Sequence, residues 1–299
     1  MPLTALALVL VAAVAHAVWN IVAAKSSGSG VVFLWWGAVV SAALWAIAIP
    51  FTGGIGTASL GSFAFGVGVS GLIHLAYMLV LQRGYAKGEV STVYATARGS
   101  GPMLTVLVSI ALFGERPGLW ALLGVVLVIA GVVSFGLIGR SRSASAVRYQ
   151  GGSARRGLDP ALVYGLLTGV AIAGYTVWDV HVVNSYGVAP VAFMVGTCIA
   201  QAFLFGALLL RRPAPLERIR DEFRTNWRRV LVFGVLSPLS YILVLTAATI
   251  APLSLVAPMR EVSVVLVGLY GVVVYRENKP VLRIIAALVV VIGVVLLGA

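Results

Sequence analysis

Two arginines lie inside apolar stretches of the sequence, where a charged side chain is costly. Arg98 is in STVYATARGSGPMLTVLVSIALFGERP, and Arg260 is in LSLVAPMREVSVVLVGLYGVVVYRENKP. An arginine at the centre of a bilayer costs about 2.5–3.5 kcal/mol on insertion scales, and such residues usually mark a functional site. A guanidinium can hold a carboxylate or a phosphate by two parallel hydrogen bonds. We therefore expect the two arginines to form an anion-selective site at mid-bilayer.

The residues that follow Arg98 strengthen this expectation. They read Gly99-Ser100-Gly101-Pro102, and Pro102 lacks the N–H that would bond to the carbonyl of Arg98. The sequence predicts a break or kink here, with a new half-helix that begins near Gly101. The N-terminus of such a half-helix would direct free N–H groups toward an anion.

Glu261 follows Arg260 directly. Adjacent residues on a regular helix do not face each other, so Glu261 need not pair with Arg260 and could pair with Arg98 instead. Two interpretations stay open. The arginines contact or gate a substrate, or an Arg–Glu pair only locks the helices together.

Three other ionisable residues in apolar stretches are candidates for function. His16 and His74 either carry a coupling proton, since histidine titrates near neutral pH, or simply bond to a neighbouring helix. Asp179 lies beside Trp178 near the end of its apolar stretch, and we interpret it as interfacial. The spacing of the histidines predicts no metal site, and the sequence holds no nucleophile motif and no phosphate-binding loop. We expect neither an enzyme nor a cofactor.

The composition predicts a membrane protein. The chain has 299 residues, of which 61% are hydrophobic and 10% charged, and this is too apolar for a soluble fold. Runs of about 20 apolar residues, enough to cross a bilayer as a helix, recur along the chain. The ten expected spans are 3–23, 31–50, 61–82, 90–112, 118–139, 160–180, 188–210, 229–248, 252–274 and 281–298.

The net charge of +12 is explained by topology rather than by nucleic-acid binding. When the loops are numbered alternately, 18 of the 21 Lys and Arg residues fall on one side and only Arg116 on the other. By the positive-inside rule the basic loops are cytoplasmic and both termini external. We expect a multi-pass protein of the bacterial plasma (inner) membrane. The amphipathic segment 215–229 is expected to form a helix that lies on the cytoplasmic leaflet.

The two halves of the sequence resemble each other. HLAYMLVLQ (74–82) matches PLSYILVLT (238–246), which sets Tyr77 against Tyr241, and AVWN (17–20) matches TVWD (176–179). Arg98 and Arg260 also fall at matching positions. Each half holds five spans, an odd number, so the second half must enter the bilayer inverted. We predict a five-helix repeat over 1–139, a basic linker over 140–159 and a second five-helix repeat over 160–299.

Four segments carry a resemblance to a known family. HAVWNIVAAK (16–25), GEVSTVYATARGSGP (88–102), LFGERPGLWALLGVVLVIAGV (112–132) and MREVSVV (259–265) are similar to recurring segments of the EamA-like branch of the drug/metabolite transporter superfamily. The resemblance implies an all-α protein of ten transmembrane helices in two inverted five-helix repeats. It also implies a central cavity formed largely by spans 1, 3, 4, 6, 8 and 9, and export or exchange of metabolites.

The sequence departs from the family pattern at three points. Relatives often have proline after the tyrosine of the arginine motif, whereas Ala95 follows Tyr94 here. Relatives are commonly drawn with cytoplasmic termini, which the loop charges contradict. Small cation-exporting relatives depend on a glutamate in the first span, and this first span holds no acid, which argues against cation export.

These observations together predict a secondary transporter of a small anionic or zwitterionic metabolite, such as an amino acid or an organic acid. It would work by alternating access, as a monomer or homodimer in the lipid bilayer. The alternative is a flippase for a lipid-linked phosphate or sugar carrier, and a non-transporting scaffold is a third possibility. The residues expected to bind substrate are Arg98, Arg260, Tyr77, Tyr241, Tyr94 and Glu261, with His16 and His74 as coupling candidates.

Overall fold

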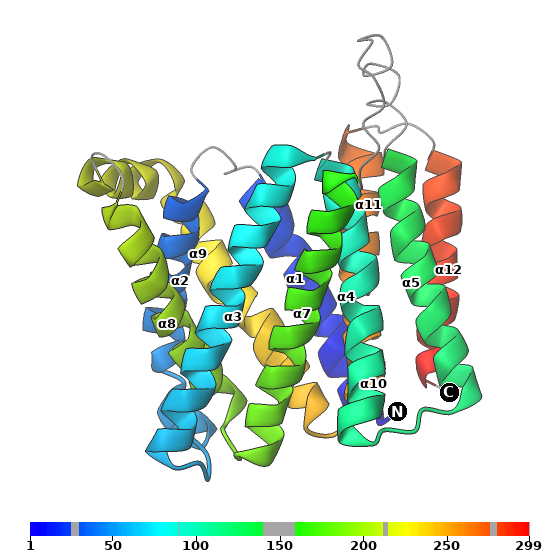
Figure 1. The fold of residues 1–299 in the computed structure, drawn as a ribbon, viewed down its shortest axis with the longest axis horizontal. Coiled ribbons are helices and arrows are strands. Elements are labelled where there is room, and N and C mark those ends of the chain that lie inside the picture. The colour runs from blue at the N-terminus through cyan, green and yellow to red at the C-terminus, as the bar shows by residue number, and fades with distance from the viewer. Residues whose placement is uncertain (25–29, 89, 140–158, 212–214, 276–279, 299) are drawn as a thin grey trace. The chain divides into compact units, whose positions relative to one another are not determined.

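The chain folds into helices that follow its apolar runs. The computed structural model describes the chain except for residues 25–29, 89, 140–158, 212–214, 276–279 and 299 (Figure 1). The helices in the described part are α1 Leu3–Ala24, α2 Val31–Ala46, the 3-10 turn η1 Ile49–Thr52, α3 Leu60–Lys87, α4 Val90–Phe113, α5 Leu119–Gly139, α7 Pro160–Ser185, α8 Pro190–Leu210, α9 Pro215–Ala248, α10 Leu253–Arg260, α11 Val262–Tyr275 and α12 Pro280–Gly298. No strand occurs among these residues.

Each of the ten expected spans coincides with helix. In the described part, eight helical stretches are long and apolar enough to cross a membrane, and Val31–Ala46 and Leu119–Ser134 are shorter apolar helices. The protein is therefore a multi-pass membrane protein. The predicted linker over 140–159 lies outside the described residues apart from its last position.

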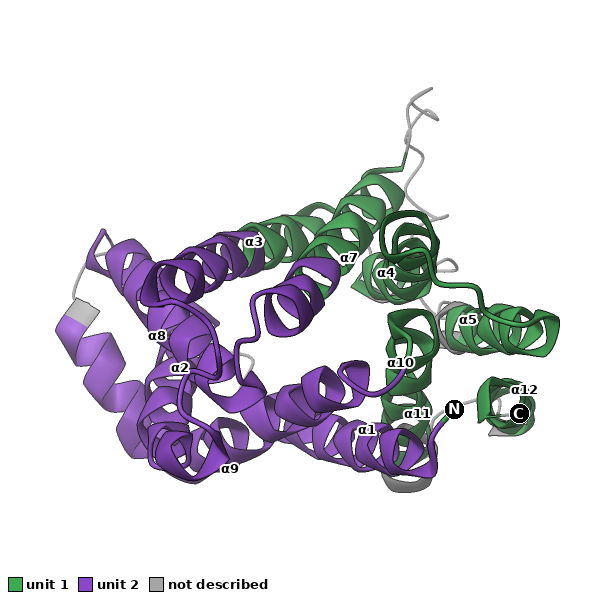
Figure 2. Cartoon of the chain, turned by 90° about the horizontal axis from the view of Figure 1, so that it is seen from below, with its two compact units in different colours: residues 1, 76–176, 252–299 green, residues 2–75, 177–251 purple. Residues whose placement is uncertain are grey.

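Two compact units divide the chain (Figure 2). Unit 1 contains Met1, Ala76–Thr176 and Pro252–Ala299, and unit 2 contains Pro2–Leu75 and Val177–Ala251. The chain passes between the units within α3 and within α7. These spatial units differ from the two halves of the sequence, and the inverted five-helix repeat stays a prediction.

Unit 2 is built around contacts of α9 with α1 and α2. Gly37 of α2 leaves room for the ring of Phe233, since a Cβ at this glycine would lie 2.6 Å from that ring. Trp19 of α1 meets the same ring edge to face at 5.1 Å between centroids. Small residues thus let helices approach where bulky side chains interlock, as helix packing in lipid requires.

The predicted amphipathic segment 215–229 is helical, but it is not a separate helix. It forms the first part of α9, which continues without interruption to Ala248. Residues 226–232 hold no glycine or proline, so nothing in the sequence ends the helix between the amphipathic segment and the span. The apolar face of the segment packs on α2, where Trp36 lies 4.5 Å from Phe223 between ring centroids and donates a hydrogen bond of 2.8 Å to the carbonyl of Ile219.

In unit 1 the helices α5 and α12 pack closely on each other. A Cβ at Gly124 would lie 2.6 Å from the carbonyl oxygen of Gly293, and one at Gly131 would lie 2.4 Å from the side chain of Val290. Backbone therefore meets backbone at this crossing, which only glycine permits. The helix α4 packs in turn on α5 and on α10.

The predicted break near Gly101 is absent, and the interruption occurs in span nine instead. α4 continues through Pro102, whereas Glu261 separates α10 from α11 with φ −69° and ψ −7°. One missing N–H does not end a helix whose neighbouring turns are intact. In α4 these turns are reinforced by hydroxyl groups, since Ser100 donates to the carbonyl of Thr96 and Thr105 to the carbonyl of Gly101, at 2.7 and 2.9 Å.

Candidate functional site

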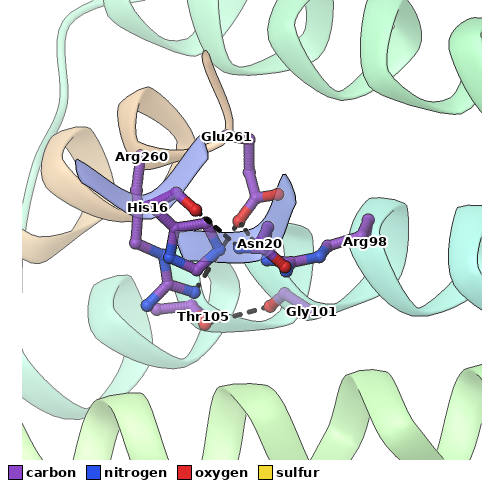
Figure 3. Close-up of polar contacts among 7 residues, drawn as sticks. All are labelled: His16, Asn20, Arg98, Gly101, Thr105, Arg260 and Glu261. Atoms are coloured by element: carbon purple, nitrogen blue, oxygen red, sulfur yellow. Dashed lines mark hydrogen bonds and ion pairs between the residues drawn. The ribbon is translucent and has the colours of Figure 1, made fainter. Parts of the chain in front are cut away.

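Three charged side chains of unit 1 meet at the interruption of span nine (Figure 3). Arg98 comes from α4, Arg260 ends α10, and Glu261 is the residue between α10 and α11. Glu261 Oε1 lies 3.5 Å from a guanidinium nitrogen of Arg98 and 3.7 Å from one of Arg260. The side chains of Arg98, Arg260 and Glu261 are exposed by only 12%, 6% and 2%. We call these three residues the arginine cluster.

Glu261 lies at a tight turn between α10 and α11. Its N–H donates to the carbonyl of Pro258 and its carbonyl accepts from the N–H of Val264, which is the bonding pattern of a 3-10 turn. At this turn the carboxylate lies beside both its sequence neighbour Arg260 and Arg98. The Arg98–Glu261 pair required by one interpretation of the sequence is present, and Arg260 also contacts the same oxygen.

The ion pairs of the arginine cluster are long, and the cluster is positively charged. Its formal charges sum to +1, and both ion-pair distances exceed the usual 2.7–2.9 Å of a charge-assisted hydrogen bond. Neither carboxylate oxygen of Glu261 has a hydrogen-bond partner among the described residues, and the same holds for the buried hydroxyl of Ser263 on α11. Buried polar groups without partners are rare in proteins, and a bound ligand is one explanation for them.

Aromatic rings accompany the cluster in unit 1. The guanidinium of Arg98 lies 5.4 Å from the ring centroid of Tyr94, one turn earlier on α4, which is within the range of a cation–π contact. Tyr77 packs edge to face on Tyr175 of α7 at 5.7 Å. Tyr175 was not singled out from the sequence, because nothing in AGYTVWD distinguishes it from an ordinary packing residue.

Tyr241 lies in unit 2, in a different set of contacts. Its hydroxyl donates a hydrogen bond of 2.6 Å to Oδ2 of Asp179 on α7. Asp179 is fully buried within unit 2, while its depth in the membrane, which the interfacial interpretation concerns, stays a prediction. That interpretation counted residues along the span, and such a count gives depth but not the face of α7, which here is covered by α9. The sequence analysis identified Tyr241 as a site residue from the repeat, but it did not predict the hydrogen bond between Tyr241 and Asp179.

The two histidines proposed as coupling residues also lie in unit 2. His74 Nδ1 lies 2.9 Å from the carbonyl oxygen of Ser70, and its ring centroid is 6.3 Å from that of Tyr241. His16 packs edge to face on Trp19 at 4.8 Å, and its carbonyl accepts a hydrogen bond of 2.7 Å from Asn20. A coupling role for either histidine stays a prediction.

Glu115 contributes to unit 1 in a way that the sequence did not indicate. Its two carboxylate oxygens accept hydrogen bonds from the backbone N–H groups of Leu253 and Ser254, at 2.7 and 2.8 Å. These N–H groups open α10 and have no partner within the helix. Glu115, in the loop after α4, thereby caps the short helix that ends in Arg260. Nothing in the sequence indicated this contact, because Glu115 lies in a loop and is far from Leu253 along the chain.

Comparisons with known proteins agree with this architecture. Residues 159–299 match the model of the EamA-like transporter family, which confirms the resemblance noted in the sequence. Among solved structures 28 chains match, and one of them, titled only as the crystal structure of a protein, is 18% identical with a TM-score of 0.73 over 99% of this chain and 96% of that chain. At this identity the likeness concerns the fold alone. No curated protein matches the sequence.

Proposed function

We propose that this chain, whose residues 159–299 place it in the EamA-like transporter family, is a secondary transporter of a small anionic or zwitterionic metabolite, such as an amino acid or an organic acid. The family match indicates a membrane transporter. The substrate class rests on one observation, the buried arginine cluster with its net positive charge.

The charges of the cluster suit a carboxylate-bearing substrate. A substrate carboxylate would take hydrogen bonds from Arg98 or Arg260 and offset the excess positive charge in a medium of low dielectric constant. Glu261 would then be free to accept the ammonium group of an amino acid. The carboxylate of an α-amino acid would face an arginine and its ammonium group would face Glu261, so an amino acid satisfies more of the cluster than a simple acid does.

Tyrosine rings would complete this site within unit 1. Tyr94 lies against Arg98 and restricts the orientation of the guanidinium, which lowers the entropy lost when a substrate binds. Tyr77 and Tyr175 form an aromatic pair suited to the apolar part of a side chain. Alternating access around this site is the mechanism that the family resemblance implies.

A groove on α4 supports the flippase alternative, because its apolar lining could hold a lipid chain. It has a volume of about 340 Å³. Its lining is mostly apolar and consists of Thr92, Ala95, Thr96, Gly99, Ser100, Met103, Ile129, Val133 and Leu162. At helical spacing these residues of α4 occupy a different face from Arg98. A lipid chain in this groove would lie along α4, the helix that carries Arg98.

Thermal stabilisation of the purified protein tests the proposal. We would compare amino acids, organic acids, nucleotides and cationic drugs on the wild type, on Arg98→Lys and Arg260→Lys, and on Arg224→Ala as an exposed control. We expect one anionic or zwitterionic class to stabilise the wild type and the control but neither lysine variant. Stabilisation that persists in both lysine variants would contradict the proposal. If no ligand acts and both variants melt early, the cluster is a structural lock.

A second variant separates the two candidate functions. Met103 lines the groove and is 44% exposed, so Met103→Trp should fill the groove without touching the arginine cluster. A transporter of free metabolites should keep its amino-acid exchange in proteoliposomes. A flippase should lose movement of a fluorescent polyprenyl phosphate between leaflets, and that loss would favour the alternative.

A further inference from the structure

We infer that Asp179 is a proton-binding site of this chain, and that it couples transport to a proton gradient. Only the claim that the proton is coupled to transport rests on the proposed function. Proton binding by Asp179 is a property that can be measured without any substrate.

The carboxylate of Asp179 is buried and accepts a hydrogen bond from a neighbouring helix. Its side chain is fully buried in unit 2, on α7, and Tyr241 of α9 donates a hydrogen bond of 2.6 Å to Oδ2. A buried carboxylate is stable as an anion only while donors compensate for its lost hydration, so a small change in its surroundings shifts it to the neutral acid. The short bond from Tyr241 is such a compensation, and it is a bond that a rearrangement of α9 against α7 would remove.

The ionisable neighbours of this site come from three helices. Tyr241 is supplied by α9, and His74 of α3 lies beyond it with its ring 6.3 Å away. On α7 itself, His181 packs against Trp178 at 6.0 Å and bonds to Ser185. We name Asp179, Tyr241 and His74 the acidic cluster.

The ligand of this site is a proton rather than a metal ion. A monovalent or divalent cation needs several oxygen ligands, whereas Tyr241 faces the carboxylate as a hydrogen-bond donor. Among the described residues no group of three or more His, Cys, Asp or Glu side chains is arranged to hold a metal. One carboxylate that gains a proton becomes a neutral acid, and no other reactant is required.

The duplicated sequence supplies its own comparison. In the matching segments AVWN (17–20) and TVWD (176–179), Asn20 occupies the position of Asp179. An asparagine has nearly the shape of an aspartate but cannot ionise. One half of the chain therefore carries the ionisable form of this position and the other half a form that is permanently neutral, as expected if a single proton site serves the whole transporter.

Infrared titration of the purified protein in deuterated buffer tests proton binding directly. We would follow the C=O band of protonated carboxyl groups between about pH 5 and 9, the range in which a coupling group must titrate. The variants are Asp179→Asn, Tyr241→Phe and, as a control, Glu222→Gln, a buried carboxylate of α9 that is bonded to Asn226. We expect one titrating component to vanish in Asp179→Asn and to move to higher pH in Tyr241→Phe, because the hydroxyl no longer stabilises the anion. Glu222→Gln should retain it.

Proteoliposomes with an entrapped pH-sensitive dye test the coupling. When an equimolar mixture of the twenty amino acids is added outside, we expect proton movement with the wild type and with Glu222→Gln, and none with Asp179→Asn. Asp179→Asn should still exchange internal for external labelled amino acids, since exchange needs no net proton transfer. Proton movement that persists in Asp179→Asn would overturn the inference.

The two arms separate failure of this inference from failure of the proposed function. The inference is overturned, whatever the chain transports, by either of two infrared results. The titrating carboxyl component is absent from the wild type, or it is present in the wild type and persists in Asp179→Asn. If no amino acid moves in any variant, the proposed substrate class fails. The infrared result then decides alone whether Asp179 binds a proton.

Discussion

The arginine cluster of unit 1 and the acidic cluster of unit 2 bury charge in opposite ways. In the arginine cluster two guanidinium groups share one carboxylate oxygen at 3.5 and 3.7 Å, and the sum of charges is positive. In the acidic cluster one carboxylate is held at 2.6 Å by a neutral hydroxyl. The first is loosely bonded and suited to exchange its partners for those of a substrate. The second is tightly bonded and changes its charge by gaining a proton.

The comparison shows how duplicated positions come to differ. Arg98 and Arg260 occupy matching places in the sequence and contact the same carboxylate in unit 1. Tyr77 and Tyr241 also match, yet Tyr77 packs its ring on Tyr175 while Tyr241 uses its hydroxyl. A matching position therefore predicts that a residue is placed on a comparable helix, but its partners decide what it does.

Loss of Glu261 should have the largest effect on the protein. Glu261→Ala leaves two buried guanidinium groups without the carboxylate between them, and breaking a buried ion pair in this way costs about 3–5 kcal/mol. We expect a marked fall in the melting temperature of the purified protein. The double variant Glu261→Ala with Arg98→Met removes one of the stranded charges and should recover part of the loss. A melting temperature close to that of the wild type in Glu261→Ala would show that the cluster is not a structural element.

Removal of the Tyr241 hydroxyl should have the next largest effect, in unit 2. Tyr241→Phe deletes a hydrogen bond to a charged and buried group, and such bonds contribute about 1.5–3 kcal/mol. The matched control is Tyr77→Phe, which keeps the ring contact with Tyr175 and should change stability little. Unfolding in denaturant at neutral pH measures both. If the two variants lose equal free energy of unfolding, the hydrogen bond from Tyr241 to Asp179 adds no stability beyond that of an ordinary tyrosine hydroxyl.

The comparison also shows how far the sequence can predict this molecule. Each expected span is helical, because a run of about 20 apolar residues in lipid has no alternative that satisfies its backbone. Arg98 and Arg260 were identifiable for the same reason, since a charge in such a run is conspicuous. The resemblance to the EamA-like transporter family was noticeable from four short segments, and residues 159–299 match the model of that family.

Contacts between helices were not predictable in the same way. Proline occurs in both arginine-bearing spans, as Pro102 and Pro258, but only the second span is interrupted. Two contacts between distant residues accompany the interrupted span, since Glu115 caps the start of α10 and Glu261 contacts Arg98 of α4. The burial of Asp179 was not predictable, because hydropathy reports how deep a residue lies along a helix and not which face it occupies. These features depend on residues far apart in the sequence.

The cap on α10 offers a smaller perturbation of the arginine cluster. Glu115→Ala removes the acceptor of two N–H groups, and loss of a helix cap costs about 0.5–2 kcal/mol. We expect a modest fall in melting temperature together with weaker binding of the stabilising ligand, since α10 carries Arg260. The neighbouring variant Arg116→Ala is the control. If Glu115→Ala lowers stability but leaves ligand binding intact, the cap does not position the cluster.

Tyr94 allows the finest distinction between the two clusters, because it and Tyr241 should respond to opposite substitutions. Tyr94 faces Arg98 with its ring, at 5.4 Å from the guanidinium, so Tyr94→Phe keeps the contact and Tyr94→Leu removes it. A cation–π contact contributes about 0.5–1 kcal/mol, rising to about 2 where it is shielded from water. We therefore expect Tyr94→Phe to match the wild type in denaturant unfolding and Tyr94→Leu to lose stability by this amount.

The same pair of substitutions at Tyr241 should give a different order. Tyr241→Phe already removes the hydrogen bond to Asp179, and Tyr241→Leu should add only the loss of ring packing. If the phenylalanine variants of both tyrosines prove equally damaging, Tyr94 acts through its hydroxyl, and the arginine cluster is held by hydrogen bonding as the acidic cluster is. If neither phenylalanine variant lowers stability, the hydrogen bond from Tyr241 to Asp179 contributes little. The acidic cluster would then not be the tightly bonded counterpart of the arginine cluster.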